Sequence, residues 1–353
     1  MKIKSFCAVF FALAFLVSSA AAAPKNIIIL IGDGMGFEQV KAGGMYQNGR
    51  AGTLFFEKLP FKGKVTTRSA NDSVTDSAAA ATAIATGKKV NNSVISIALP
   101  GDGSDLQTIL EYYKAKGKST GLVTTTYLTH ATPAAFAAHA SGRNDTNEIG
   151  KYMIEVTKPE VLLGGGGHGI EIEAAEASGY AVVTDAAGMK ALDTENATMT
   201  LGAFGRDYMP YEFDGAGAMP HLTEMAATAL KILDNDPDGL FLMIEGGRID
   251  HAGHDNNIER NIRETAEFSK TVKIIHDWAK KNPGTLIIVT ADHETGGLKV
   301  ISNKGKGKAP EVTWGSKGHT GVDVPVYAYG YEAKQFGRSL DNTEFFKLLT
   351  QMR

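Results

Sequence analysis

The sequence predicts an α/β protein, a three-layer sandwich in which a central, mostly parallel sheet is flanked by helices on both faces. Unbroken aliphatic runs at 26–31, 239–244 and 285–290 lack the alternation of a half-exposed strand, so each is expected to be a strand buried on both faces. Stretches with helical periodicity, such as 105–116 and 258–280, alternate with these runs and would supply the outer layers. With 353 residues and 43% hydrophobic content, the chain is large enough to bury such a core.

The first 23 residues have the pattern of a secretory signal peptide. Lys2 and Lys4 precede an apolar run over 6–17, and the small residues of 18–23 suit a cleavage site. This run is too short for the ~20 residues of a membrane span, so no membrane anchor is expected. We therefore expect a periplasmic or secreted protein, which would lose its only cysteine, Cys7, with the signal peptide and hold together without disulfides.

We expect residues 24–353 to form a single domain. The region around 161–220 mixes short helical and strand-like pieces, and we expect it to decorate this domain as a cap near the site. Its glycine run, 164–169, lacks the Lys-Ser/Thr ending of a phosphate loop. The Gly- and Lys-rich segment 302–317 is expected to be a surface loop. A net charge of −3 gives no support for a nucleic-acid partner, and none is expected.

Polar side chains follow the predicted buried strands at the points where these strands end. Asp33 comes after the first aliphatic run, Glu245 after the second, and Asp292 and His293 after the third. Thr132 follows a further predicted strand. Because open α/β sheets bind ligands at the carboxyl ends of their parallel strands, these side chains are expected to converge on one site.

The segment after the second aliphatic run concentrates residues that could bind metal. Asp250 and His254 are four apart, which on a helical turn places a carboxylate beside an imidazole, and His251 lies between them. This spacing alone fits a solvated helix face equally well, but the carboxylate at the strand end and the neighbouring glycines favour a metal site. His319, in a Gly-His-Thr-Gly setting after a loop, suits a ligand that reaches into a cleft.

Two further residues suit chemistry on an anion. Ser77 stands in the first turn of a predicted Ala-rich helix, where the helix dipole favours an anion and an ionised hydroxyl, although an ordinary capping serine is the alternative. Arg143 offers a planar fork for phosphate oxygens. Thr132 either caps the helix that Pro133 would start or gives its hydroxyl to a hard cation. His139, among alanines, is expected to be packed rather than a ligand.

The candidate ligands form a mixed set of donors. Histidine with aspartate suits zinc, whereas the oxygens of glutamate, aspartate and threonine suit magnesium, so a pair of borderline cations and a hard third cation are expected. Two cations roughly 4 Å apart are the usual arrangement for in-line displacement at phosphorus.

Taken together, these segments closely resemble the alkaline phosphatase family over nearly the whole mature chain. The segments that carry the resemblance are Asp33-Gly34-Met35, Thr75-Asp76-Ser77-Ala78-Ala79, His130-Ala131-Thr132-Pro133-Ala134, Glu245-Gly246, Asp250 through His254, Thr290-Ala291-Asp292-His293-Glu294 and Gly318-His319-Thr320.

The resemblance implies two Zn²⁺ and one Mg²⁺ per chain. The implied ligands are Asp250, His254 and His319 for the first zinc, Asp33, Asp292 and His293 for the second, and Asp33, Thr132 and Glu245 for magnesium. The resemblance also implies hydrolysis of small phosphate monoesters at alkaline pH, with Ser77 attacking phosphorus to give a phosphoserine and Arg143 holding two phosphate oxygens.

Two positions beside the implied magnesium site depart from part of the family. Some members have an acidic residue where this chain has His130 and a lysine where it has His251, which leaves the metal preference of the third site open. The chain is also short for the family, and a homodimer is left open. The competing functions are a diesterase relative with the same two-zinc core and a secreted metal-binding protein without turnover, for which Ser77 would be dispensable.

Overall fold

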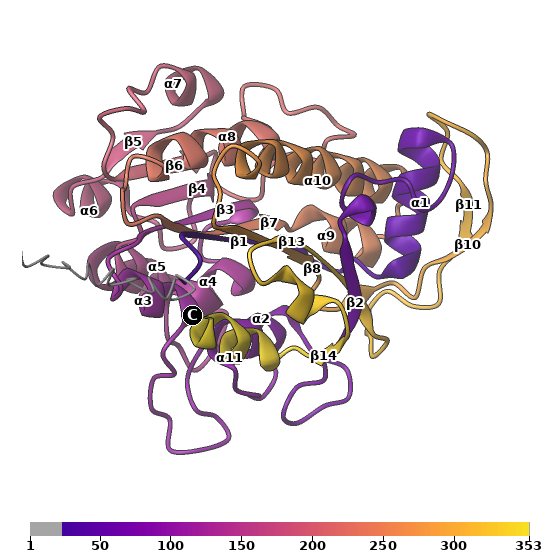
Figure 1. Cartoon of the computed structure of the whole chain (residues 1–353), viewed down its shortest axis with the longest axis horizontal. Coiled ribbons are helices and arrows are strands. Elements are labelled where there is room, and N and C mark those ends of the chain that lie inside the picture. Colours follow the sequence, from indigo (N-terminus) through magenta and orange to yellow (C-terminus); the bar gives the residue numbers. More distant parts are fainter. Residues whose placement is uncertain (1–22, 353) are drawn as a thin grey trace, which may run out of the picture.

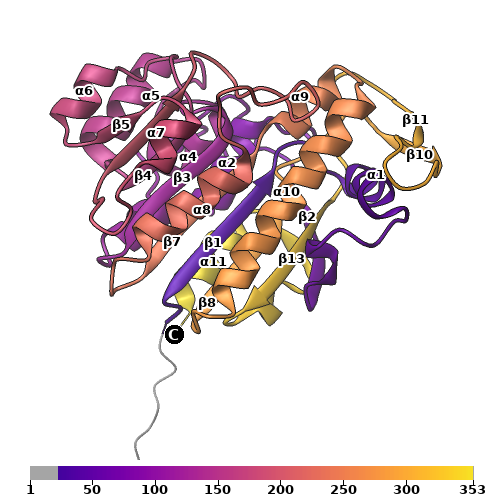
Figure 2. The ribbon, with the colours of Figure 1, turned by 90° about the horizontal axis from the view of Figure 1, so that it is seen from above.

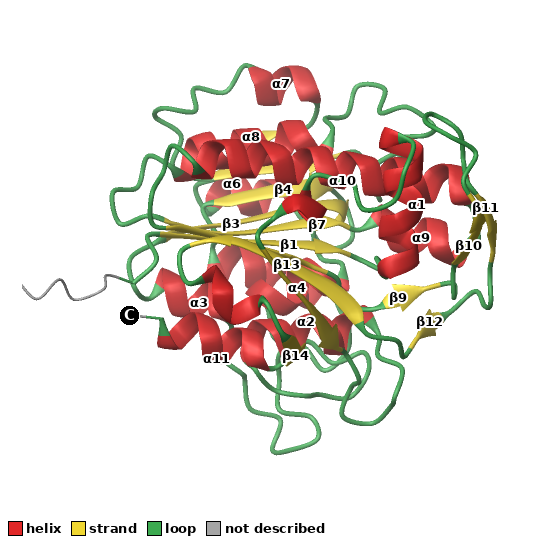
Figure 3. Cartoon of the chain, turned by 45° about the vertical axis from the view of Figure 1, so that its right-hand side comes forward, coloured by secondary structure: helices red, strands yellow, loops and turns green. Residues whose placement is uncertain are grey.

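The computed structural model of the chain describes residues 23–352. A ten-stranded sheet runs through the middle of the molecule and helices cover both of its faces, which confirms the predicted three-layer α/β sandwich (Figures 1 and 3). The predicted signal peptide, residues 1–23, lies outside the described residues except for Ala23. No helix within 23–352 is both long enough and apolar enough to cross a bilayer.

The central sheet is built from ten strands. They are β1 (Asn26–Gly32), β2 (Phe61–Thr66), β3 (Ser119–Tyr127), β4 (Val161–Gly165), β5 (Ala181–Val183), β6 (Thr200–Phe204), β7 (Leu240–Gly246), β8 (Thr285–Thr290), β13 (Val324–Gly330) and β14 (Ser339–Asp341). Their order in the sheet is β14-β2-β13-β8-β1-β7-β3-β4-β6-β5, and the pairs are parallel except the two that β13 makes.

Four short strands form two small ribbons outside the central sheet. They are β9 (Glu294–Thr295) with β12 (His319–Thr320), and β10 (Lys299–Ser302) with β11 (Glu311–Thr313). The segment 302–317, expected to be a loop, therefore contains a strand, since β11 pairs antiparallel with β10. The β9–β12 ribbon matters for the site because it ties the segment around His319 to the end of β8.

Eleven α-helices and three shorter helical turns complete the described chain. They are α1 (Phe37–Asn48), α2 (Ser77–Thr86), α3 (Ile109–Lys114), α4 (Ala131–Ala137), α5 (Thr146–Tyr152), α6 (Ile172–Ala177), α7 (Ala186–Lys190), α8 (Leu222–Leu233), α9 (Arg248–His254), α10 (Ile258–Ala279), α11 (Glu344–Gln351), η1 (Phe56–Lys58), η2 (Met153–Thr157) and η3 (Ala333–Phe336). Helices α8 and α10 lie along one face of the sheet, while α2, α3, α4 and α11 cover the other (Figures 2 and 3).

The three aliphatic runs form adjacent strands at the centre of the sheet. Every residue of β1, β7 and β8 is buried, as expected for strands covered on both faces. Ile31 of β1 pairs with Glu245 of β7 and Thr290 of β8, so these strands end at the same level. The side chains that follow them therefore meet at one edge of the sheet.

Two predicted helix starts were wrong, and a side-chain cap explains the first of them. The helix expected over 105–116 begins only at Ile109, because Thr108 caps it by a reciprocal pair of hydrogen bonds with Glu111. In α4 the residue before the first turn is His130, not Thr132. Thr132 therefore lies inside the helix with its hydroxyl free for a role other than capping.

The region 161–220 is continuous with the sheet. It contributes β4, β6 and β5 to one end of the sheet and α6 and α7 to the periphery. Its last part, the loop that contains Tyr208 and Tyr211, contacts helix α9 beside the edge where β7 ends.

Candidate metal centre

Three clusters of possible metal ligands lie at the carboxyl edge of the central strands, and within each cluster the ligand atoms are within 4.8 Å of one another. The clusters are Asp250, His254 and His319; Asp33, Asp292 and His293; and Asp33, His130 and Glu245. The structure therefore brings together residues from six separate segments that the sequence predicted to converge. Asp33, directly after β1, belongs to two of the clusters.

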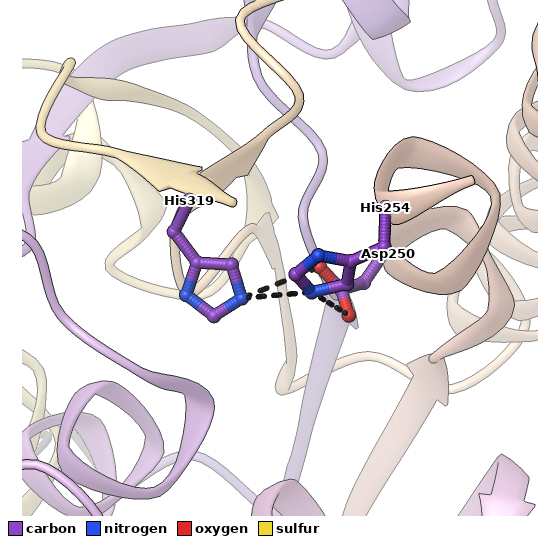
Figure 4. Close-up of side chains that lie close together, drawn as sticks. All are labelled: Asp250, His254 and His319. Carbon is purple, nitrogen blue, oxygen red and sulfur yellow. Dashed lines mark hydrogen bonds and ion pairs between the residues drawn. The ribbon is translucent and has the colours of Figure 1, made fainter. Parts of the chain in front are cut away.

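The first cluster joins helix α9 to the β9–β12 ribbon (Figure 4). His254 Nε2 lies 3.2 Å from Asp250 Oδ2 and 3.2 Å from His319 Nε2. The other ring nitrogens contact backbone carbonyls, with His254 Nδ1 2.5 Å from Lys317 O and His319 Nδ1 2.8 Å from Thr75 O. Because a carbonyl oxygen can only accept a hydrogen bond, Nδ1 of each ring carries the proton, and the lone pair of Nε2 is available to a metal ion in the neutral ring.

The second cluster lies at the ends of β1 and β8 and is fully buried. His293 Nε2 is 3.2 Å from Asp292 Oδ2 and 3.4 Å from Asp33 Oδ1. Backbone N–H groups of Gly34 and His293 both donate to Asp292 Oδ1, at 3.1 and 2.9 Å, and hold this carboxylate in place. The hydroxyl of Ser77 lies 3.2 Å from His293 Nε2, so the candidate nucleophile adjoins this cluster.

The third cluster includes His130 among its possible ligands, whereas the sequence predicted that His130 would lie beside the magnesium site without binding the metal. His130 has a ring nitrogen within ligand distance of Asp33 and Glu245, and its Nδ1 is buried without a hydrogen-bond partner in the described chain. Thr132 is fully buried beside Glu245. The Thr126 hydroxyl donates to Glu245 Oε2 at 3.1 Å, which leaves Oε1 for another partner. The donors at this position are therefore a mixture of nitrogen and oxygen.

Several carboxylate oxygens of the second and third clusters are buried and accept no hydrogen bond from the described residues. They are both Oδ atoms of Asp33, Oδ2 of Asp292 and Oε1 of Glu245. Burial, together with the charges of Asp292, Asp250 and Glu245, raises the pKa of Asp33 well above its ordinary value. Burial likewise raises the pKa of Glu245 to about 7. Crowded, buried acceptors of this kind are costly unless cations neutralise them, so the donor set fits divalent metal ions.

In the first cluster, by contrast, the pKa values of the two imidazoles shift in opposite directions. The hydrogen bond to Asp250 raises the pKa of His254 to about 9. Burial and the charge of His293 lower the pKa of His319 to about 4. A metal ion bound here would displace the proton of His254, because imidazole binds metals in its neutral form.

Ser77 and Arg143 are held together by one aspartate. Asp76 caps α2 by accepting a hydrogen bond from Ala79 N at 3.0 Å, and its second carboxylate oxygen lies 3.0 Å from Arg143 Nη1. Ser77 is the first residue of the helix and is 2% exposed. Arg143 Nη2 lies 3.2 Å from His130 Nε2, so the guanidinium also borders the third cluster. A group bound between Ser77 and Arg143 would face both the helix N-terminus and the metal ligands.

His251 and His139 have different surroundings. His251 lies on α9 with its ring 5.6 Å from that of His130, so it borders the third cluster as expected, and its Nδ1 is 2.7 Å from Arg248 Nη1. His139 is packed, as predicted: its Nδ1 lies 2.7 Å from Ser96 O and its Nε2 2.9 Å from Glu111 Oε1.

The sequence alone missed two residues that support the site. Asp76 received no role of its own from the sequence, but it binds Arg143, and its position directly before Ser77 was the available signal. Thr295 donates a hydrogen bond from its hydroxyl to Asp250 Oδ1 and so orients a ligand of the first cluster. Its position two residues after His293 was the only signal of this role.

Comparison with known proteins agrees with the fold. The family model described as alkaline phosphatase matches residues 24–310. Alkaline phosphatase 3 of Bacillus subtilis is 35% identical over 410 residues, covering 92% of this chain and 87% of that protein. The alkaline phosphatase of the Antarctic bacterium TAB5 has 29% identity and a TM-score of 0.83, covering 94% of this chain and 98% of its own. A variant of the TAB5 enzyme with magnesium bound in its M3 site has 28% identity and a TM-score of 0.82, covering 94% of this chain and 99% of its own.

Fold and sequence thus define this protein as a phosphate monoester hydrolase with candidate metal sites at the carboxyl edge of its sheet. The chain belongs to the alkaline phosphatase family.

Proposed function

We propose that this enzyme hydrolyses small phosphate monoesters in two steps, through a phosphoserine on Ser77, with two zinc ions and one magnesium ion bound. The observation that carries the proposal is the position of Ser77, whose hydroxyl lies 3.2 Å from His293 in a cluster of buried carboxylates with unpartnered oxygens. A serine hydroxyl beside candidate metal ligands is well placed as a nucleophile.

The residues that would hold the metals are those of the three clusters. Asp250, His254 and His319 would bind the first zinc, and Asp33, Asp292 and His293 the second. Asp33, Glu245 and Thr132 would bind magnesium, and His130 and His251 border that site. Two variants of the TAB5 enzyme, in which one histidine is replaced by aspartate or by glutamate, have magnesium bound in the M3 site, and they are the precedent for magnesium in a relative. Bound metals would lower the pKa of the attacking hydroxyl and neutralise the charge of the departing oxygen.

The chain's own residues prepare the attack. The Ser77 hydroxyl loses its proton and its oxygen forms a bond to phosphorus while the bond from phosphorus to the ester oxygen breaks. The departing oxygen takes up a proton to give the alcohol, so the protons balance. His293 lies 3.2 Å from the Ser77 hydroxyl and restricts its orientation. The N-terminus of α2 points its free N–H groups toward the negative charge that develops on the phosphoryl group.

Arg143 would hold the phosphate through two of its guanidinium N–H groups. Asp76 contacts Nη1 from one side, and His130 Nε2 faces Nη2 from the other. These contacts fix the plane of the guanidinium before substrate binds, which reduces the entropy lost on binding. A monoester dianion presents oxygens to this fork that a diester has in part replaced by a second ester group.

Water then hydrolyses the phosphoserine. Attack by water on phosphorus breaks the bond to the serine oxygen, releases inorganic phosphate and returns the serine hydroxyl. We further propose that the enzyme works at alkaline pH, since both attacking oxygens must be deprotonated. Cleavage of the predicted signal peptide, residues 1–23, would place the mature enzyme in the periplasm or outside the cell. Size-exclusion chromatography would test whether the mature enzyme forms a homodimer.

The experiment that tests the proposal compares a chromogenic phosphate monoester with the corresponding diester in alkaline buffer. Hydrolysis is measured before chelation, after chelation, and after zinc and magnesium are added back singly and together. We expect a strong preference for the monoester that is lost on chelation and restored most fully by both metals. Preference for the diester, or activity that does not respond to chelation, would overturn the proposal.

A further inference from the structure

A hollow of about 600 Å³ opens beside the metal-ligand edge. One wall is the loop after β6, over residues 207–214, and the other is helix α9 with the start of α10. His251 and His254 of α9 contribute to its lining. The reaction described above assigns no role to this space or to the aromatic residues around it.

The position of the hollow relative to Ser77 indicates what could fill it. From the Ser77 hydroxyl, contacts pass to His293 at 3.2 Å, from the His293 ring to the His319 ring at 3.5 Å between centroids, and from His319 Nε2 to His254 Nε2 at 3.2 Å. His254 therefore has one side in the first cluster and the other in the hollow. In an in-line displacement the ester oxygen departs on the side of phosphorus opposite to Ser77. The alcohol portion of the substrate would extend past the first cluster toward this space.

The walls of the hollow are rich in planar groups. The guanidinium carbon of Arg248 lies 3.7 Å from the ring centroid of Tyr211 and 5.0 Å from that of Tyr208, and Arg260 lies 4.3 Å from the Tyr211 ring. The Tyr208 ring is 4.4 Å from the ring of His251. Arginine and tyrosine planes are surfaces on which heteroaromatic rings stack.

The two arginines that line the hollow differ in how their charges are paired. Arg260 is paired with Asp214 at 2.8 Å and with Asp255 at 3.6 Å, so its charge is largely neutralised. Arg248 contacts His251 at 2.7 Å, and among the described residues no salt bridge pairs it with a carboxylate. Its Nε is buried and lacks a hydrogen-bond partner within that part of the chain. Its guanidinium is thus held in place chiefly by stacking.

We propose that this hollow binds the alcohol portion of the phosphate monoester and favours substrates that carry a planar heteroaromatic ring there, as nucleoside 5′-monophosphates do. Tyr208 and Arg248 would be the residues that determine this preference. The inference rests on the proposed function, because it requires the phosphate to be bound at Ser77 and Arg143. It adds a substrate class that the metal clusters themselves do not select.

The test uses two substrates with the same leaving oxygen. Adenosine 5′-monophosphate and ribose 5-phosphate differ in the base, so the chemistry of bond cleavage is matched. We expect wild-type kcat/KM to be about tenfold higher for the nucleotide, mainly through KM, since one base stacked on an aromatic side chain supplies a factor of this order. Tyr208→Leu should reduce this ratio to near one, and Arg248→Lys, which keeps the charge but loses the plane, should reduce it in part.

The matched control is Tyr46→Leu. Tyr46 also lies near an arginine, Arg263 at 5.4 Å, but it lines a different hollow, between α1 and α10, which no residue of the three clusters lines. We expect this variant to keep the wild-type ratio. Loss of the ratio in the control as well would attribute the Tyr208 effect to general destabilisation and overturn the assignment.

A second measurement does not depend on turnover. Saturation-transfer NMR with the purified full-length protein and adenosine should detect the ring protons of the base in the wild type and give a several-fold weaker signal in Tyr208→Leu. If the enzyme hydrolyses both substrates with equal kcat/KM and adenosine gives no signal, the hollow does not bind the ring, although the proposed function stands. If neither substrate is hydrolysed, the proposed function itself fails.

Discussion

The two ends of the central strands differ in how their buried polar groups are satisfied. At the amino end, the side-chain amide of Asn26 donates to Thr285 Oγ1 at 3.0 Å and its carbonyl accepts from Leu240 N at 3.3 Å. Lys118 closes the same end by donating to the carbonyls of Lys25 and Asp238, both at 2.7 Å. Polar groups there complete one another and hold β1, β7 and β8 in register.

At the carboxyl end of the same strands, the buried polar groups do not satisfy one another's hydrogen bonds. Asp33, Glu245 and Asp292 are fully buried, and each keeps at least one oxygen without a hydrogen-bond partner in the described chain. Since the strands are the same, the difference lies in what each end serves. The polar groups at the amino end stabilise the fold. The buried carboxylates at the carboxyl end lower the stability of the metal-free fold but present negative charge to a ligand. Substitutions at the two ends should therefore affect different properties.

The largest effect is expected for Ser77→Ala. Removal of the nucleophile should lower kcat for a monoester by about a thousandfold or more, because the covalent step is lost. The metal content should be retained, since the metal-binding clusters do not include Ser77. Ser73→Ala, at an exposed serine four residues earlier, is the matched control and should have wild-type rates. Activity of Ser77→Ala within tenfold of the wild type would exclude the phosphoserine.

Asp33→Asn should have effects of opposite sign on function and stability. Asp33 belongs to two clusters, so metal content and hydrolysis should both fall, with the rate lowered about a hundredfold or more. Burial and neighbouring carboxylates raise the pKa of Asp33, which means that its charge destabilises the metal-free fold. The chelated variant should consequently unfold at a higher temperature than the chelated wild type in alkaline buffer. A lower unfolding temperature would show that Asp33 has a structural role instead.

Asn26→Ala should show the reverse pattern at the other end of the strand. It removes both hydrogen bonds of a side chain that is 3% exposed, so the free energy of unfolding should fall by about 1–3 kcal/mol. Metal content and kcat should stay at wild-type values. Denaturant unfolding together with metal analysis checks this prediction. A selective loss of zinc in Asn26→Ala would contradict the claim that the amino end of the strands serves stability alone.

Glu264→Gln tests the effect of burial on a carboxylate that lies outside the metal clusters, for comparison with the carboxylates inside them. Glu264 of α10 accepts a hydrogen bond from Glu212 N at 2.7 Å, and burial raises its pKa to about 8 from an ordinary value of 4.5. Between these values the folded chain keeps a proton that the unfolded chain has lost, so stability falls as pH rises. Glutamine keeps the acceptor without the charge. The variant should be close to the wild type near pH 5 and should exceed its free energy of unfolding by roughly 4–5 kcal/mol above about pH 8.

The matching measurement for Glu264→Gln is the free energy of unfolding of both proteins across that pH range. A difference that is constant with pH would show that the Glu264 carboxyl does not titrate on folding. Because Glu264 is outside the metal clusters, hydrolysis should follow the stability of the fold only and should not change its metal dependence.

Much of the fold could be predicted from the sequence because its signals are local. The aliphatic runs of β1, β7 and β8 are favourable only in the middle of a sheet covered on both faces, and the helix expected over 258–280 agrees with α10 (Ile258–Ala279) to within one residue. Helix starts were less predictable: capping by Thr108 depends on side-chain hydrogen bonds that periodicity does not reveal, and α4 begins two residues before Pro133 without a side-chain cap.

The convergence of the site residues could be predicted for the same reason that the strands could. Residues after parallel buried strands must meet at one edge, so Asp33, Glu245 and Asp292 are found together. The partners that orient them come from distant segments and carry no pattern of their own. Thr295 beside Asp250 and the loop containing Tyr208 beside α9 depend on how the β9–β12 ribbon and the end of the 161–220 region fold back.

The most direct test of the central claim, that the unpartnered carboxylates are metal ligands, is the metal content of the purified protein measured together with its unfolding temperature. Elemental analysis should find two zinc ions and one magnesium ion per chain in the wild type and fewer in Asp33→Asn. Chelation should lower the unfolding temperature of the wild type, and added zinc and magnesium should restore it. A protein that is purified without metal, and whose unfolding responds to neither chelator nor added ions, would contradict the claim.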